Sequence, residues 1–78
     1  MAVKKLQLYQ AKSMPDRFYR PIVMNEDGLW SIELFDKEKG NKMLKYLGMG
    51  RAKTESLETH CEKVDGKKYK TDTGNEVD

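Results

Sequence analysis

LWSIELFD, residues 29–36, shows the clearest period of two in the chain. Trp30, Ile32 and Leu34 point to one side of an extended strand, whereas Phe35 points to the other side with Ser31 and Glu33. A strand of this kind is half buried in a sheet. We therefore expect residues 29–36 to form a central strand, with Trp30 in the core.

A turn stands on each side of this strand. NEDG, residues 25–28, contains an Asp-Gly pair that tolerates positive φ, and KEKGNK, residues 37–42, is a longer turn. These turns join the central strand to FYRPIVM, residues 18–24, and to MLKYLGM, residues 43–49. Pro21 cannot donate to a ladder, so the first of these strands is expected at an edge or with a bulge.

The period changes from two to that of a helix after Gly50. Thr54 is a good N-cap, and Leu57, Cys61 and Val64 recur at helical spacing. Gly66 is the expected left-handed residue that follows the helix. A helix from Thr54 to about Val64 is predicted.

Residues 3–11 alternate around Leu6 and Leu8 and add another strand on the N-terminal side. The fold class predicted is α+β: a three- to four-stranded antiparallel sheet with one C-terminal helix packed on one face. Residues 1–71 form a single small domain in this prediction. Residues 72–78 are expected to be a flexible tail, and whether residues 67–71 add a strand stays open.

The composition limits the protein to a thin core. The chain has 78 residues, of which 37% are hydrophobic and 36% charged, and Cys61 is its single cysteine. A single cysteine excludes a disulfide within the chain. With no signal peptide and no apolar run of membrane-spanning length, the expected location is the cytoplasm, without a membrane partner.

LGMGRAKTES, residues 47–56, contains two glycines, two cations and a hydroxyl, as phosphate-binding loops do. It does not match a P-loop, because Ala52 stands where the motif requires glycine before the lysine. We instead expect Gly48 or Gly50 to have positive φ and to bend the chain into the helix. Arg51 and Lys53 would then flank a helix N-terminus that attracts an anion.

No catalytic constellation is visible in the sequence. His60 and Cys61 are adjacent, so on a helix their side chains point about 100° apart and cannot form a dyad or share a metal ion. The carboxylates lie in turns and on the outer side of the helix. We therefore predict a protein that is not an enzyme and that uses no metal or cofactor.

Residues 28–64 resemble a DNA-binding domain of three strands and one helix, which is found at the N-terminus of tyrosine integrases and in Apetala-type transcription factors. The shared features are the Trp30 strand, the Asp36–Gly40 turn, the Gly48–Gly50 corner, and Lys53-Thr54 at the helix entry. The resemblance implies a sheet that enters the major groove and reads bases. The chain departs from the family in its helix, where Glu58, Thr59 and His60 replace the usual alanines.

A nucleic-acid-binding module is one of two functional hypotheses. The face opposite Trp30 is expected to present aromatic residues among lysines, a pattern that suits stacking on bases and contact with phosphates. Its residues are Lys5, Tyr9, Phe35 and Lys45, together with Arg20. Glu33 on the same face would repel a phosphate, and Tyr9 and Phe35 could instead pair across strands for stability alone.

A protein-binding module is the second hypothesis, and we prefer it because a net charge of +2 is low for a nucleic-acid-binding protein. Exposed methionines adapt well to partner surfaces, which suits a small inhibitor or adaptor of the kind that phages encode. The predicted docking patch comprises Met24, Phe35, Met43, Leu47 and Met49. The same residues could complete a thin core or a homodimer.

Overall fold

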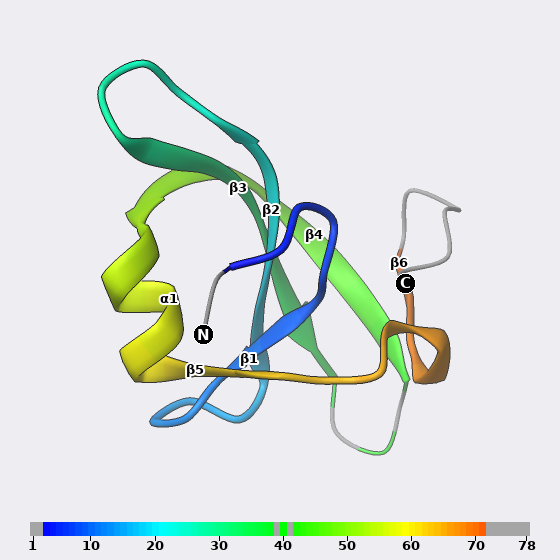
Figure 1. The fold of residues 1–78 in the computed structure, drawn as a ribbon. Coiled ribbons are helices and arrows are strands. Elements are labelled where there is room, and N and C mark those ends of the chain that lie inside the picture. The colour runs from blue at the N-terminus through cyan, green and yellow to red at the C-terminus, as the bar shows by residue number, and fades with distance from the viewer. Residues whose placement is uncertain (1–2, 39, 41, 72–78) are drawn as a thin grey trace.

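The computed structural model describes residues 3–38, 40 and 42–71. In this part of the chain six strands form one curled sheet, accompanied by one α-helix (Figure 1). The elements in chain order are β1 (Tyr9–Ala11), β2 (Arg17–Met24), β3 (Leu29–Lys37), β4 (Met43–Lys53), α1 (Thr54–His60), β5 (Cys61–Lys63), the 3₁₀ helix η1 (Gly66–Lys68) and β6 (Lys70–Thr71).

The sheet has the strand order β5-β1-β2-β3-β4-β6. The pairs among the first five strands are antiparallel, as predicted, whereas β6 pairs with β4 in parallel. The prediction of three or four strands was therefore too small. The two strands at the edges, β5 and β6, have three and two residues, which is too short for an alternation of apolar and polar residues to indicate a strand.

The β2–β3 turn forms as the Asp-Gly pair predicts. Gly28 has φ of 84° and donates its N–H to the Asn25 carbonyl at 3.0 Å, and Asn25 donates its own N–H to the Leu29 carbonyl at 2.9 Å. This closed turn sets the register of β2 against β3. The hairpin extends beyond the rest of the sheet (Figure 1).

Two irregularities bend the sheet. The β2–β3 register shifts between Pro21 and Val23, so that of the two predicted alternatives, an edge strand or a bulge, the bulge is present. The β3–β4 register shifts where Leu34 pairs with Gly48 and Phe35 with Tyr46, so that Leu47 is the extra residue. Gly48 has φ of 136°, as expected for one of the two glycines. The bend lies inside β4, however, and not at the entry to the helix.

The sheet carries an apolar cluster on each face. The helix-side cluster is built on buried Tyr9, Ile32, Leu57 and Cys61, and Trp30 packs against it half buried. The opposite cluster is built on Leu8, Phe18, Phe35 and Leu44, with Tyr46, Val64 and Tyr69 against them. The core is thus split between two faces, and the predicted single covered face was wrong.

The helix is shorter than its apolar period predicts. It spans Thr54–His60, and Cys61 has extended backbone angles and begins β5, which pairs with β1. Hydrogen bonds to a neighbouring strand satisfy the backbone of Cys61–Lys63 as well as a helix would, and they also bury Cys61 beside Ala11. Local helical spacing was therefore outweighed by strand pairing.

Three further local predictions were wrong. Lys53, not Thr54, is the N-cap of α1, and no side chain caps it; the Thr54 hydroxyl instead accepts a hydrogen bond of 3.0 Å from Trp30 Nε1. Gly66 starts η1 and is buried, so it does not follow the end of α1. Leu6, which was predicted to lie in a strand, instead lies exposed in a turn before β1, with φ of 66°. Its N–H donates to the Pro21 carbonyl.

The chain after α1 crosses from one edge of the sheet to the other. It leaves β5 at one edge and reaches β6 at the opposite edge (Figure 1). On the way Val64 donates its N–H to the Leu8 carbonyl at 3.1 Å, and the rings of Tyr69 and Phe18 lie 5.0 Å apart. This crossing segment, residues 64–69, covers the opposite cluster. The predicted tail, residues 72–78, lies outside the described residues.

Within the described residues, the helices are too short to span a bilayer.

Candidate binding surface

Phe35 and Tyr9, the two aromatic residues expected on an outward face, lie in the core. Phe35 has no exposed surface and its ring lies 5.8 Å from that of Tyr46, while Tyr9 is 3% exposed. The expectation that both face solvent was wrong. The crossing segment covers the face that carries Phe35, and the helix-side cluster encloses Tyr9.

Arg20 lies beside Phe35 on the opposite face and is itself nearly buried. Its guanidinium carbon lies 5.4 Å above the centre of the Phe35 ring, and its Nη2 is 2.6 Å from Glu33 Oε1. Arg20 Nε donates to the same carboxylate oxygen at 2.7 Å. Glu33 therefore neutralises Arg20, and the repulsion that it would exert on a phosphate is balanced by this partner.

The strand register continues this face toward the β2–β3 hairpin. Arg20 pairs with Glu33 and Glu33 with Met49, and in the next row Val23 pairs with Ser31 and Ser31 with Arg51. Paired residues of neighbouring strands share a face. These six residues, Arg20, Val23, Ser31, Glu33, Met49 and Arg51, are called the open patch below.

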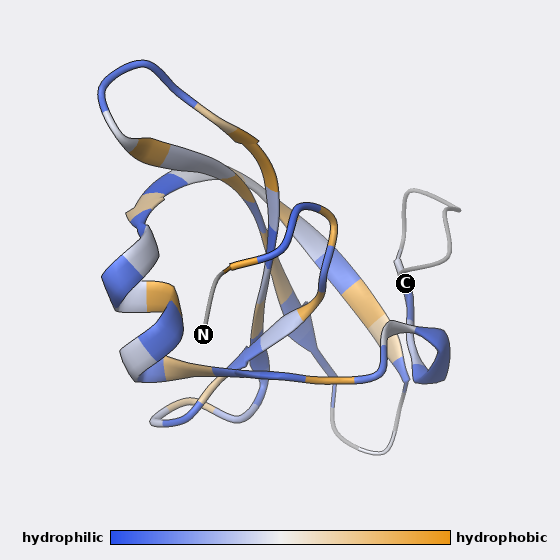
Figure 2. Cartoon of the chain, in the orientation of Figure 1, coloured by the Kyte–Doolittle hydropathy of each residue, from blue (hydrophilic) through white to orange (hydrophobic). Residues whose placement is uncertain are grey.

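The open patch contains exposed apolar side chains. Val23 is 46% exposed and Met49 54% exposed, although Val23 lies within β2 and Met49 within β4. The crossing segment packs over the row of Phe18, Phe35 and Tyr46 and leaves these two residues accessible. Figure 2 shows hydrophobic colour on β2 close to the hairpin.

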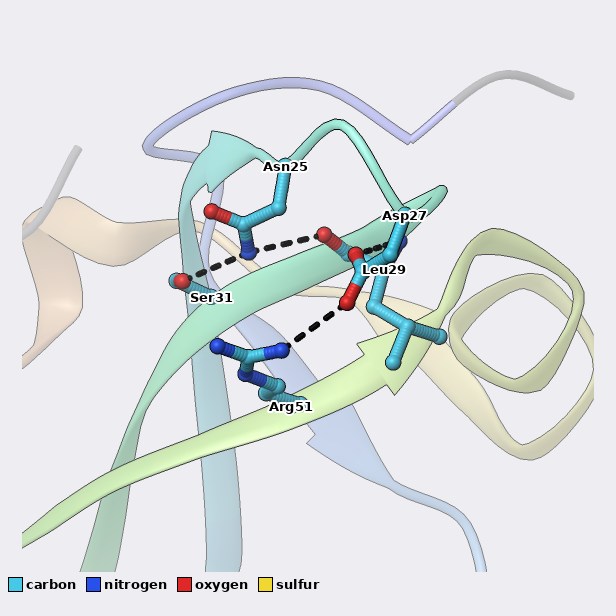
Figure 3. A network of polar contacts seen from close by, with 5 residues as sticks. All are labelled: Asn25, Asp27, Leu29, Ser31 and Arg51. Atoms are coloured by element: carbon cyan, nitrogen blue, oxygen red, sulfur yellow. Dashed lines mark hydrogen bonds and ion pairs between the residues drawn. The ribbon is translucent and has the colours of Figure 1, made fainter.

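A network of polar contacts holds the hairpin end of the open patch (Figure 3). Asn25 Nδ2 donates to Ser31 Oγ at 2.8 Å and to the Leu29 carbonyl at 2.9 Å. Asp27 accepts from the Leu29 N–H at 3.0 Å and from Arg51 Nη1 at 2.9 Å. Both guanidinium groups of the patch are thus paired with carboxylates, and the surface is close to neutral.

The remaining predicted site residues do not join this surface. Lys5 lies in the turn before β1, where Lys4, Lys5, Leu6 and Gln7 line a hollow of about 220 Å³. Lys45 lies opposite Asp36 in the register of β3 and β4, and Leu47 is the exposed extra residue of the β4 bulge. Met24 pairs with Trp30 and therefore lies on the face of the helix. The eleven predicted residues are spread over several surfaces.

The corner expected to attract an anion is also different from its prediction. Arg51 is engaged with Asp27, and Lys53 is exposed at the end of β4. The helix that follows has seven residues, and its first turn carries Glu55. A negative side chain in that position already interacts favourably with the helix dipole.

One group of lysines was not predicted from the sequence as a possible binding site. Lys42, Met43, Lys67, Lys68 and Lys70 line a hollow of about 210 Å³ where β6 meets the start of β4. The signal in the sequence is KKYK, residues 67–70, which reads as an ordinary polar segment. Only the pairing of β6 with β4 adds Lys42 and Met43 to it.

Among the described residues, two groups have displaced pKa values, and neither lies in the open patch. Burial raises the pKa of the Cys61 thiol, an effect that the nearby Lys12 charge partly offsets. A thiol of this kind is a poor nucleophile at neutral pH. The hydrogen bond from Arg17 Nε to Asp36 Oδ1, 2.6 Å long, raises the pKa of Arg17. In the described part of the chain, no three His, Cys, Asp or Glu residues gather to hold a metal ion.

Comparisons with protein-family models, curated proteins and solved structures found no match for this chain. The resemblance of residues 28–64 to the integrase and Apetala-type domain therefore stays a prediction.

Proposed function

We propose that this chain is a small non-enzymatic binding protein that docks another protein on the open patch. The observation that carries the proposal is the exposure of Val23 and Met49, two apolar side chains that the strand register places on one face of the sheet. Exposed apolar side chains grouped on one rigid face are typical of interaction surfaces.

The charges of the patch indicate the chemistry of the partner. Arg20 is paired with Glu33 and Arg51 with Asp27, so a partner gains little from a strongly negative surface. An apolar group that packs against Met49 and Val23, within a polar rim, fits this arrangement better than a row of phosphates. An inhibitor or adaptor would act through such a contact.

The aromatic residues on which the nucleic-acid hypothesis depended are not accessible on this face. Stacking requires an accessible aromatic ring, and Phe35 and Tyr9 are buried. We therefore assign protein binding to the open patch.

Capture from a nuclease-treated lysate of the source cell, followed by identification and titration of the bound protein, tests this proposal. In the variant Val23→Thr/Met49→Gln, we expect the affinity for that protein to fall by about 1–3 kcal/mol, because two apolar contacts at the centre are lost. Both residues are exposed, so the melting temperature should change little.

Met14→Gln is the matched control. Met14 is 50% exposed, close to the 54% of Met49, but it lies in the β1–β2 connection, away from the patch. Binding should be retained in this variant. Equal losses in both variants would contradict the assignment of the patch, as would a partner that nuclease releases. Self-association that the double variant abolishes would replace the partner protein by a second copy of the chain.

A further inference from the structure

The hollow between β4, η1 and β6 concentrates positive charge from two segments of the chain, residue 42 and residues 67–70. Lys42 precedes β4, Lys67 and Lys68 belong to η1, and Lys70 begins β6. The hollow measures about 210 Å³, and Met43 is the one apolar side chain among the described residues that line it. We call this group of five residues the lysine hollow.

Backbone contacts hold the lysine hollow together. Lys70 donates its N–H to the Lys42 carbonyl at 3.1 Å, and β6 pairs with β4 through Met43 and Lys70. The 3₁₀ turn is closed by Asp65, whose Oδ1 accepts from the Lys67 N–H at 3.0 Å while its carbonyl accepts from the Lys68 N–H at 3.1 Å. The four lysines are therefore presented by an ordered backbone.

The four lysines form no ion pair with another described residue. No carboxylate in the described part of the chain lines the hollow, and the ion pairs and side-chain hydrogen bonds do not include the ammonium groups of these four lysines. The contrast with the open patch is direct, because each arginine there has its own carboxylate. An anion that enters the hollow is attracted by the positive charges that line it.

We propose that the lysine hollow binds the phosphate groups of a nucleic-acid strand. Lysine is a compact point charge that contacts phosphate oxygens without demanding a fixed orientation, whereas planar carboxylate partners favour the arginine fork. Successive phosphates supply the several negative charges that four lysines can neutralise. Met43, which is 38% exposed, offers an apolar contact for a sugar or base.

A membrane surface fits these observations less well. Peripheral membrane binding combines basic residues with several apolar side chains that insert into the bilayer. The described part of the hollow has one such side chain, Met43. The lysine hollow shares no residue with the open patch, so each of the two proposals can be tested independently of the other.

The test is fluorescence anisotropy of a short labelled single-stranded oligonucleotide across about 50–200 mM salt. The unmodified protein should bind with an affinity that falls steeply as salt rises. Lys67→Gln/Lys68→Gln/Lys70→Gln should weaken binding at least tenfold and reduce the slope of log affinity against log salt by about 2, since each phosphate contact on a single strand contributes about 0.7. The corresponding triple arginine variant should retain binding.

The control removes the same charge elsewhere. Lys4, Lys12 and Lys63 are exposed and lie outside the hollow, and their triple glutamine variant should keep the salt slope. Circular dichroism melts should show that both triple variants are folded. Equal losses in the two variants would overturn the proposal, because binding would then follow net charge alone. Stronger binding to inorganic polyphosphate or to phosphatidylserine vesicles than to the oligonucleotide would overturn it as well.

Discussion

Phe35 shows how strongly a residue's role depends on what covers it. Its alternation with Leu34 places it correctly on the face opposite Trp30, yet that face is covered by the crossing segment and Phe35 is fully buried. Arg20 and Tyr46 pack against its ring. An aromatic residue in this position contributes to stability, through the apolar surface that it removes from water.

We predict that Phe35→Ala lowers the free energy of unfolding by about 3–5 kcal/mol, because it leaves a cavity between Phe18 and Tyr46. Urea denaturation followed by Trp30 fluorescence measures this change. Met49→Ala on the same face should cost less than about 0.5 kcal/mol, since Met49 is exposed. Similar midpoints for Phe35→Ala and the unmodified protein would mean that Phe35 is not a core residue.

Thr54 allows a second test at the scale of single residues. Its hydroxyl accepts from Trp30 Nε1 at 3.0 Å and caps no helix N–H. Thr54→Val should therefore cost about 1 kcal/mol in the unmodified protein and almost nothing in a Trp30→Phe background, where the donor is absent. Equal costs in both backgrounds, measured by thermal melts, would show that Thr54 acts as a cap after all.

Among the elements, β4 is the one whose shape depends on a single glycine. Gly48 has φ of 136°, and the space around its Cα is open, so any side chain there is opposed by backbone strain and not by a clash. Gly50, two residues later, has ordinary φ, and a Cβ there would lie 3.4 Å from Leu34 Cδ1. The two glycines therefore resist substitution for different reasons.

We predict that Gly48→Ala destabilises the protein by about 1–2 kcal/mol, the usual cost of forcing a side chain into this backbone region. Gly50→Ala should cost less, because the Leu34 side chain can move by a few tenths of an ångström. Chemical denaturation of the two variants compares them directly. The opposite order would show that the bulge at Leu47 does not depend on Gly48.

For the whole molecule, the decisive feature is the crossing segment. It joins the two edge strands and covers the face that holds Phe18 and Phe35. It also carries two of the four lysines of the lysine hollow, Lys67 and Lys68, and it leads directly to a third, Lys70, in β6. Residues 54–78 hold seven Asp or Glu against four Lys, yet no carboxylate among the described residues lines the lysine hollow.

We predict that a chain ending at residue 63 does not fold cooperatively, because its opposite cluster would be open to water. Tyr69→Ala in the full chain should cost about 1–3 kcal/mol, since the ring of Tyr69 packs 5.0 Å from that of Phe18. Differential scanning calorimetry provides both measurements. A sharp transition of the truncated chain would show that the crossing segment is an appendage.

The sequence by itself determined the local order of the sheet. The period of two in residues 29–36, the Asp-Gly turn and the proline in β2 are effects of near neighbours, and they correctly predict three central strands, a bulge and a glycine with positive φ. Such features depend on backbone sterics and on which side chains share a face. They can be read from a few consecutive residues.

Only the tertiary structure decided where the helix ends and which face is covered. Cys61–Lys63 forms a strand and not a helical turn, because it makes backbone hydrogen bonds with β1. Phe35 is buried because a segment about 30 residues later packs over it. The lysine hollow arises in the same way, from the pairing of Lys70 with Met43. Contacts between distant parts of the chain leave no local period, and for this reason both candidate binding surfaces became visible only in the fold.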